Sequence, residues 1–294
     1  MRFRRIGART VSAIGLGGMP LSIEGRPARD RAIATIHAAL DAGITFIDTA
    51  DAYTLDADGP GHNERLIAEA LGSYSGDISQ VLVATKGGLV HRDGSGPWDR
   101  VGSADHLTKA AHASRERLGV ESIDLYQFHA PDPTVDYRES MTAIRDLLDD
   151  GVMQMAGISN VNIEQIEIAQ DVLDGRLVSV QNRYSPISRT TQAELEYCAH
   201  HEIAFLPWSP LGGIGNAAEV FASQRVFADV ADELSYGTER VSPQRVALAW
   251  ELALEHVVIP IPGSRRPESI TDSAKAADLV LTADQLARLN ADKD

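Results

Sequence analysis

Short apolar runs alternate with longer segments of helical periodicity along the whole chain, and this alternation restricts the fold more than any other feature. The runs that we predict to be strands are residues 11–16, 44–48, 81–86, 123–129, 155–159, 178–181, 204–207 and 257–261. Between them lie apolar stripes at helical spacing, such as Met141, Ile144 and Leu148 ahead of Gly151. Strands that alternate with helices predict βαβ units and a parallel sheet.

Two architectures are built from such units, a doubly wound open sheet and a closed (β/α)8 TIM barrel. The number of predicted strands favours the barrel. No Pro- or Ser-rich linker divides the chain, so we expect residues 1–294 to form a single (β/α)8-barrel domain of α/β class. Residues 2–10, with Gly7 at their centre, predict a short N-terminal β-hairpin that closes the bottom of the barrel.

The chain is strongly acidic, with 42 Asp and Glu against 27 Lys and Arg and a formal net charge of −15. Such a surface repels phosphate backbones and anionic lipids, so we expect no nucleic-acid or membrane partner. The basic N-terminus is not followed by the apolar stretch of a secretory signal, which favours a cytoplasmic protein. The one cysteine, Cys198, excludes an internal disulfide.

Three common ligand-binding signatures are missing from the sequence. The histidines show no His-x-x-x-His or Glu-x-x-His spacing, so we expect no metal site. No Gly-x-x-x-x-Gly-Lys-Ser/Thr loop is present, and nucleoside triphosphate hydrolysis therefore has no support. The run from Gly15 to Pro20 resembles a Rossmann fingerprint only superficially, because Pro20 stands where the third glycine is needed.

Polar residues close or directly follow several of the predicted strands. These residues are Asp48, Lys86, His129, Ser159, Asn160 and Gln181. In a (β/α) barrel the carboxyl ends of all strands open on one face, where active sites lie. Any single residue of this set could be an ordinary turn or capping residue. The same property at five strand ends favours a functional site.

Four of the chain's residues can be combined into one catalytic unit: Asp48, Tyr53, Lys86 and His129. A phenol has a pKa near ~10, which is high for a proton donor at neutral pH. The ammonium of Lys86, held by Asp48, is expected to lower the pKa of Tyr53, while His129 donates a hydrogen bond to a carbonyl oxygen that gains charge. This unit suits hydride delivery to a carbonyl. The residues alone equally allow a structural ion pair between Asp48 and Lys86.

Several longer motifs accompany this unit in order along the chain. They are Phe-Ile-Asp-Thr-Ala-Asp-Ala-Tyr at 46–53, Asn-Glu at 63–64, Val-Ala-Thr-Lys at 83–86 and Asp-Leu-Tyr-Gln-Phe-His at 124–129. With them the chain resembles the aldo-keto reductase superfamily over nearly its full length. The resemblance implies a TIM barrel and an NADPH coenzyme, with NADH possible. It also implies that the four residues of the unit are the family's catalytic tetrad.

The same resemblance assigns coenzyme contacts to the second half of the chain. Ser159, Asn160 and Gln181 look like the residues that hold the nicotinamide carboxamide. The run Trp-Ser-Pro-Leu-Gly-Gly at 208–213 resembles the segment whose aromatic ring stacks on the nicotinamide and whose next residues contact the pyrophosphate. The residues assigned in this run are Trp208, Ser209, Leu211 and Gly212.

The run Ile-Pro-Gly-Ser-Arg-Arg at 261–266 resembles the family's adenosine-phosphate loop. The residues assigned there are Gly263, Ser264, Arg265 and Arg266. Two arginines in so acidic a chain suit the 2′-phosphate of NADPH and favour it over NADH. Against the adenine, Asp272 and Ser273 replace the family's common Glu-Asn pair, and Ser269 replaces a frequent arginine.

We therefore predict an NADPH-dependent aldo-keto reductase that transfers hydride reversibly to an aldehyde or ketone. Two alternatives remain open: a Schiff-base aldolase or lyase that uses Lys86, and a non-catalytic, coenzyme-binding redox-sensing subunit. The expected substrate is a small or medium carbonyl compound, and the expected state is a monomer. The loops expected to set the substrate are residues 55–62, 91–101, 131–136 and 211–216.

Overall fold

The computed structural model describes residues 1–55, 59–90, 98–213, 221 and 224–291. Its main sheet has seven strands in the order β11-β10-β9-β8-β5-β4-β3, and every neighbouring pair is parallel. The strands are β3 (Leu16–Gly17), β4 (Phe46–Asp48), β5 (Leu82–Gly87), β8 (Ile123–Phe128), β9 (Met153–Ser159), β10 (Leu177–Gln181) and β11 (Ala204–Phe205). Six of the predicted strands, from 44–48 to 204–207, are confirmed with small shifts at their ends.

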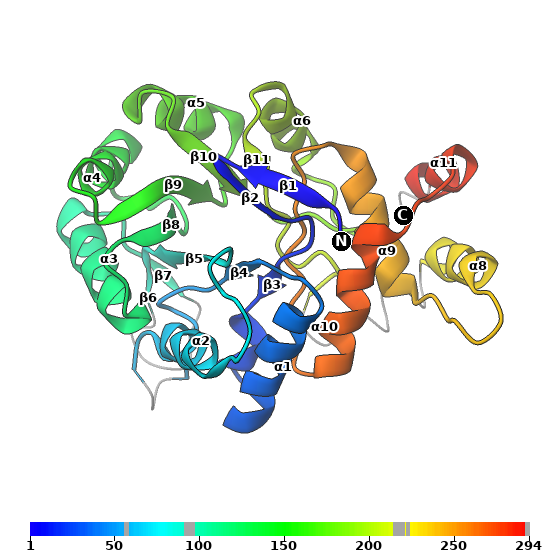
Figure 1. Cartoon of the computed structure of the whole chain (residues 1–294). Helices are drawn as coiled ribbons and strands as arrows, with labels where there is room; N and C mark the ends of the chain where they lie inside the picture. The colour runs from blue at the N-terminus through cyan, green and yellow to red at the C-terminus, as the bar shows by residue number, and fades with distance from the viewer. Residues whose placement is uncertain (56–58, 91–97, 214–220, 222–223, 292–294) are drawn as a thin grey trace.

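The position of the eighth predicted strand, between β11 and β3, is taken by residues 257–263. This segment makes isolated parallel bridges to Phe205 on one side and to Gly17 on the other. The prediction of a regular strand here is wrong, because Pro260 and Pro262 have no N–H to donate and interrupt the ladder. The two bridges still join the edges of the sheet, which gives an α/β fold of TIM-barrel type (Figure 1).

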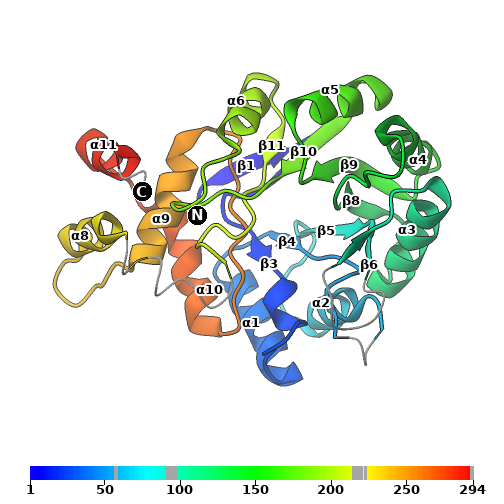
Figure 2. The same ribbon diagram turned by 180° about the vertical axis from the view of Figure 1, so that it is seen from behind.

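The amino-terminal segment forms an antiparallel hairpin of β1 (Phe3–Ile6) and β2 (Arg9–Ser12). Gly7 in its turn has a φ of 54°, a left-handed conformation that glycine adopts readily. The predicted barrel strand at 11–16 is wrong at its start, because its first two residues belong to β2 and the barrel strand is β3. Figure 1 shows the hairpin in front of the ring of strands, and Figure 2, from behind, shows it on the far side.

Helices follow the strands along the chain and surround the ring (Figures 1 and 2). They are α1 (Arg29–Asp41), α2 (His62–Ser73), α3 (Ala104–Leu118), α4 (Tyr137–Asp149), α5 (Ile163–Val172), α6 (Gln192–His200), α8 (Arg225–Leu234), α9 (Pro243–Leu254), α10 (Pro267–Ala274) and α11 (Ala283–Ala291), with the 3-10 turns η1 (Met19–Leu21) and η3 (Lys275–Asp278). A second small hairpin, β6 (Leu89–Val90) with β7 (Asp99–Arg100), follows β5. The predicted apolar stripe of Met141, Ile144 and Leu148 lies on α4, where Ile144 is fully buried, and Ile36 of α1 and Ile166 of α5 are buried in the same way.

The interior of the ring is apolar at one end and polar at the other. Phe46 and Leu125 belong to a buried cluster that also contains residues of the amino-terminal hairpin. Because successive side chains of a strand alternate between its faces, the residue two positions further on points to the same interior. Those residues are Asp48 on β4 and Gln127 on β8, and both are buried. The same alternation places Lys86 of β5 inside the ring, so the strands carry the polar group at their carboxyl ends.

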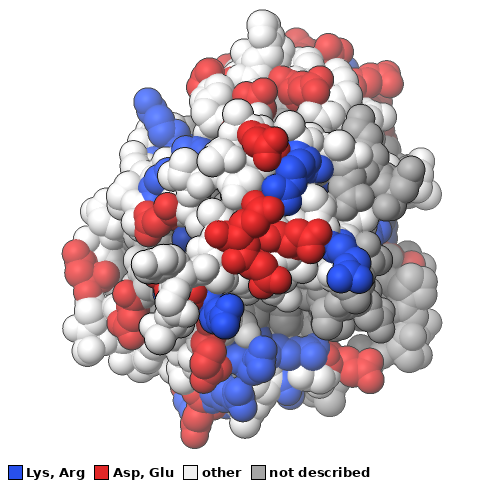
Figure 3. All heavy atoms as spheres, turned by 90° about the vertical axis from the view of Figure 1, so that its right-hand side faces the viewer, with Lys and Arg blue, Asp and Glu red and all other residues white. Residues whose placement is uncertain are grey.

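The surface of the molecule reflects its net charge of −15. Figure 3 shows the face that carries α8 and α11, where Asp and Glu side chains gather near the centre and Lys and Arg lie around them. Within the described ranges, no helix is both long enough and apolar enough to cross a membrane.

Candidate active site

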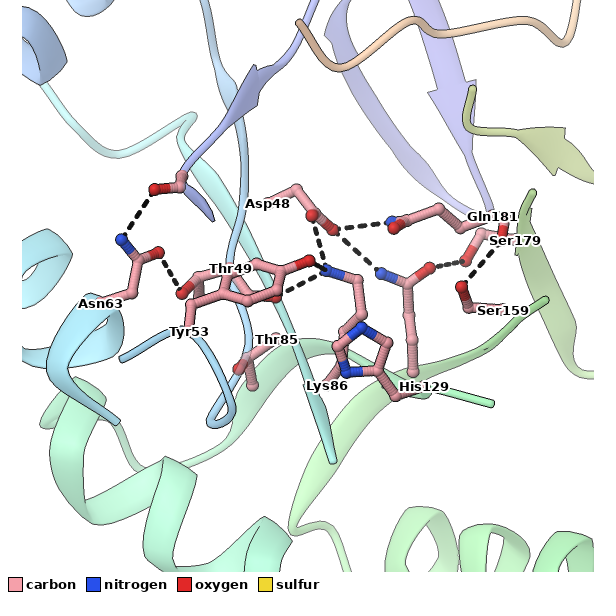
Figure 4. Close-up of polar contacts among 12 residues, drawn as sticks. Asp48, Thr49, Tyr53, Asn63, Thr85, Lys86, His129, Ser159, Ser179 and Gln181 are labelled. Carbon is pink, nitrogen blue, oxygen red and sulfur yellow. Dashed lines mark hydrogen bonds and ion pairs between the residues drawn. The ribbon is translucent and has the colours of Figure 1, made fainter. Parts of the chain in front are cut away.

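Lys86 is the centre of the polar group at the carboxyl ends of the strands (Figure 4). Its Nζ donates to Asp48 Oδ1 at 2.6 Å, to the Thr49 carbonyl at 2.8 Å and to the Tyr53 hydroxyl at 3.0 Å. These three acceptors use all three ammonium hydrogens. Burial alone lowers the pKa of Lys86, but Asp48 and then Tyr53 oppose it, and the pKa ends above its ordinary value. Lys86 is therefore a fully buried and charged ammonium.

Asp48 is held on both oxygens. Its Oδ1 accepts from Lys86, and its Oδ2 accepts from Gln181 Nε2 at 2.8 Å and from Gln127 Nε2 at 3.2 Å. A buried carboxylate is tolerated only when it is paired and hydrogen-bonded in this way. Gln127 was not identified from the sequence. The signal was available, because this polar residue follows the apolar Leu125 on the inward face of one strand.

Tyr53 lies in the loop after β4, and its ring is almost completely buried. Burial raises the pKa of its phenol, and the positive charge of Lys86 acts in the opposite direction without reversing the shift. The expected net lowering of this pKa is therefore wrong, because desolvation of the phenolate outweighs the ammonium. The phenol is protonated at neutral pH and is hydrogen-bonded to a charged donor.

His129 directly follows β8 and meets Tyr53 edge to face, with ring centroids 5.8 Å apart at 81°. Burial, and then the charge of Lys86, hold the pKa of its imidazole well below the usual range, so the ring is neutral at pH 7. Its Nδ1 is buried and has no hydrogen-bond partner among the described residues. Trp98 lies 5.9 Å from Tyr53 and 6.0 Å from His129 between ring centroids, and it packs on an apolar group of Ala52, Leu89 and Ala130.

A cavity of about 1230 Å³ begins at Tyr53 and His129 and extends to α10. Most of the site residues expected from the sequence line it: Asp48, Tyr53, His129, Ser159, Asn160, Gln181, Trp208, Ser209, Leu211, Gly263, Ser264, Arg265, Arg266, Asp272 and Ser273. Lys86 lies behind the wall, and Gly212 is buried beside the lining residue Gly213. Of the loops expected to set the substrate, residues 56–58, 91–97 and 214–216 lie outside the described residues.

The residues assigned to the nicotinamide end are fixed by hydrogen bonds to one another. Ser159 Oγ donates to the Gln181 carbonyl at 2.8 Å. Asn160 Nδ2 donates to the His129 carbonyl at 2.9 Å, and Trp208 Nε1 donates to Asn160 Oδ1 at 3.1 Å. Asn160 has a φ of 60°, a left-handed conformation that asparagine tolerates better than most residues. These bonds orient the half-buried Trp208 ring at the cavity wall.

The two arginines assigned to the α10 end of the cavity, Arg265 and Arg266, bond to different parts of the chain. Arg265 reaches across to η1 and to the loop after it, where its guanidinium donates to the carbonyls of Pro20 at 3.3 Å and Glu24 at 2.6 Å. Arg266 donates to Ser269 Oγ at 3.0 Å, and its backbone N–H donates to Ser264 Oγ at 3.1 Å. Arg266 therefore has the hydroxyl groups of Ser264 and Ser269 beside it. A cation with neighbouring hydroxyl groups is suited to bind an anion.

Asp272 lines the cavity, but its carboxylate is occupied by two residues of the α9 region. Arg245 and Ser242 both donate to it, and Arg245 is almost fully buried. Two other arginines, Arg31 on α1 and Arg100 on β7, line the cavity; neither was singled out from the sequence, although Arg100 falls within the loop 91–101 that was expected to set the substrate. No sequence signal identifies them, because a lone surface arginine is normally a solvated charge. Among the described residues, no cluster of three or more His, Cys, Asp or Glu could hold a metal ion.

Comparisons with known proteins identify the family of this chain. The family model of the Aldo/keto reductase family matches residues 13–293. The chain is 33% identical over 290 residues to an uncharacterized oxidoreductase of Schizosaccharomyces pombe, covering 97% of this chain and 88% of that protein. It is 34% identical over 279 residues to 6-dehydroglucose reductase of Novosphingobium aromaticivorans, covering 93% and 90%. The crystal structure of an aldo/keto reductase from Klebsiella pneumoniae in complex with NADP and acetate matches with a TM-score of 0.80 at 24% identity, covering 98% and 94%.

The fold and its buried polar group at the strand ends together define an α/β enzyme of TIM-barrel type. The chain belongs to the aldo/keto reductase family, and it is an oxidoreductase.

Proposed function

We propose that the protein reduces an aldehyde or ketone reversibly with NADPH, and that Tyr53 donates the proton. The observation that carries the proposal is the position of the Lys86 ammonium, which donates to Asp48 and to the Tyr53 hydroxyl at once. A buried cation beside a phenol stabilises the phenolate that remains after proton transfer. A purely structural ion pair has no need of the second contact.

Tyr53, Lys86 and His129 have different roles at the carbonyl oxygen of the substrate. NADPH, when bound, supplies the hydride that forms the new C–H bond. Tyr53 donates its proton to the oxygen as negative charge develops there, and the Lys86 ammonium balances the phenolate until solvent returns the proton. His129, neutral and beside Tyr53, donates a second hydrogen bond to the same oxygen from one ring nitrogen. The raised pKa of Tyr53 keeps the proton in place until the oxygen becomes basic.

The residues around the cavity fit this coenzyme. Gln181 and Asn160 are hydrogen-bonded to Asp48 and His129, and together with Ser159 they would hold the carboxamide, while Trp208 offers its ring face to the nicotinamide. Ser209, Leu211 and Gly212 contact the pyrophosphate, and Gly263, Ser264, Arg265 and Arg266 bind the adenosine phosphate, with Ser273 at the adenine. Asp272 acts mainly through Arg245, which occupies its carboxylate. The NADP of the Klebsiella pneumoniae structure supports the same coenzyme here.

The Schiff-base alternative is disfavoured by the state of Lys86. Imine formation needs a neutral amine that can reach the substrate. Lys86 is fully buried, its pKa is raised, and all of its hydrogens are donated to protein acceptors.

We also propose that residues 1–294 form one domain whose amino-terminal hairpin closes the lower end of the barrel. Ile6 and Val11 of the hairpin are fully buried in the interior cluster. A Cβ placed on Gly7 would lie 2.9 Å from Val178 Cγ1, so the turn approaches β10 closely.

Replacement of Tyr53 by Phe tests the proposed function. The variant lacks the proton but keeps the ring, so we expect kcat for carbonyl reduction to fall by about 10²–10⁴-fold. NADPH binding, followed by quenching of tryptophan fluorescence, should change little. The matched control is Tyr236→Phe, because Tyr236 is 90% exposed. Wild-type turnover in the Tyr53→Phe variant would contradict the assignment.

A further inference from the structure

The wall of the cavity is cationic although the molecule as a whole is acidic. Its charged lining residues are Arg31, Arg100, Arg265 and Arg266 against Asp48, Glu268 and Asp272. Two of these acids are already paired, Asp48 with Lys86 and Asp272 with Arg245. Lys86 and Arg245 neutralise these two acids from outside the cavity lining. Four arginines then remain against Glu268, so the net charge of the wall is positive. A cleft of this kind draws anions into a molecule that otherwise repels them.

The four arginines stand at two different ends of the cavity. Arg265 and Arg266 precede α10, and α1, which carries Arg31, packs along α10. These three form the end that the proposed function assigns to the adenosine phosphates. Arg100 is on β7, where it pairs in register with Leu89 of β6.

Leu89 places Arg100 on the substrate side of the tetrad. Its side chain belongs to the apolar group with Ala52, Ala130 and Trp98. Trp98 in turn lies within 6.0 Å, between ring centroids, of both Tyr53 and His129. The wall next to the proposed reacting carbon is thus an apolar collar with one arginine beside it, within the part of the chain that the structure describes.

The guanidinium of Arg100 is held in place by a hydrogen bond that uses only part of its donor capacity. Its Nη1 donates to the Pro131 carbonyl at 3.2 Å, which is its one hydrogen bond to the described residues. The carboxylate of Asp132 interacts electrostatically with Arg100, but its hydrogen bonds come from other residues: its oxygens accept from the Gly102 N–H at 2.9 Å and from the Thr134 N–H and hydroxyl at 2.9 and 2.7 Å. Most of the five donors of Arg100 therefore stay available at the cavity.

We propose that the substrate is a carbonyl compound that carries a carboxylate, and that Arg100 binds this carboxylate while the apolar collar holds the carbon skeleton. This inference rests on the proposed function. A planar guanidinium fork matches a carboxylate through two parallel hydrogen bonds. A single arginine suits a singly charged carboxylate, whereas the doubly charged phosphate is better served by several donors, as at the α10 end.

A pair of nearly isosteric aldehydes tests the proposal, namely 4-carboxybenzaldehyde and its neutral amide, 4-formylbenzamide, each assayed with NADPH at neutral pH. We expect kcat/KM to favour the carboxylate by about tenfold or more, mainly through a lower KM, because the contact lies away from the reacting carbon. The preference should shrink as salt is added. In Arg100→Gln the ratio of the two kcat/KM values should fall towards one.

The control is Arg145→Gln, which removes the same charge from a partly exposed arginine of α4 that bonds Asp146 and does not line the cavity. This variant should keep the wild-type ratio. A wild-type ratio near one, or an unchanged ratio in Arg100→Gln, would overturn the carboxylate site while leaving the reductase intact.

A binding measurement separates this proposal from the proposed function. Titration calorimetry of the protein with NADP⁺ present compares 4-(hydroxymethyl)benzoate with 4-(hydroxymethyl)benzamide, and neither ligand needs turnover. Tighter binding of the benzoate, lost in Arg100→Gln, supports the site even if neither aldehyde is reduced. Absence of reduction of both aldehydes overturns the reductase, and equal binding of the two alcohols overturns the site.

Discussion

At the scale of single residues, the chemistry depends on how one ammonium is shared. Lys86 has three hydrogens and three acceptors, and two of these acceptors are the carboxylate and the phenol that the proposed mechanism needs. Asp48 is fixed in turn by Gln127 and Gln181. Each residue of this network is positioned by its hydrogen bonds to the others. The loss of one side chain therefore leaves a buried partner without a hydrogen bond.

Replacement of Lys86 by Met should show this dependence as a loss of stability. The variant leaves the Asp48 carboxylate buried without its cation, which costs about 3–5 kcal/mol in the free energy of unfolding. Urea denaturation measures the cost. The double variant Lys86→Met with Asp48→Asn carries no buried charge at this place and should lose less than the single variant. An equal or larger loss in the double variant would contradict the argument.

The sequence predicted that Asp48, Lys86 and His129 lie together because they close or follow strands, and it missed residues whose role depends on contacts. Gln127 could have been suspected from its place two residues after Leu125, but its contact with Asp48 is visible only in the structure, as is the position of Arg100 at the cavity. The sign of the Tyr53 pKa shift was wrong for a similar reason. A sequence names the neighbouring charge but does not measure how completely the phenol is removed from water.

At the scale of elements, the alternation of strands and helices was predictable, and the pairing of the end segments was not. Residues 11–16 and 257–261 are both apolar enough for barrel strands. The first begins in a hairpin, and the second makes only isolated bridges because of its prolines. An apolar pattern predicts that a segment is buried. The hydrogen-bond partners of that segment depend on which other segments lie beside it.

The start of α5 gives a prediction at this scale. Asn162 accepts from the Gln165 N–H at 2.9 Å, and the Gln165 side chain accepts from the Asn162 N–H at 3.0 Å, which is a complete capping box. Asn162→Ala should therefore reduce the free energy of unfolding by ~1 kcal/mol in urea denaturation. The control is Ser103→Ala at the start of α3, where the side chain makes no capping bond. An equal loss in both variants would contradict the capping role.

At the scale of the whole molecule, stability should depend on pH in an unusual direction. The chain carries many acidic groups, and two buried ones, Asp51 and Glu251, have carboxyl oxygens without a hydrogen-bond partner in the described residues. Burial, and then the charge of Glu64, raise the pKa of Asp51 from 3.8 to about 8. Between those values the folded state binds more protons than the unfolded state, so the free energy of unfolding falls as pH rises and levels off above about 8.

Asp51→Asn should remove the part of this dependence that belongs to Asp51. The amide resembles the protonated carboxyl and does not ionise, so the variant should gain stability over the wild type as pH rises from 5 to 8, by at most ~1.4 kcal/mol per pH unit. Urea denaturation at several pH values measures the difference, and subtraction cancels the contribution that Glu251 makes to both proteins. Asp150→Asn, at an exposed position, is the control for net charge. A difference between Asp51→Asn and wild type that stays constant with pH would show that Asp51 is ionised in the folded protein throughout this range.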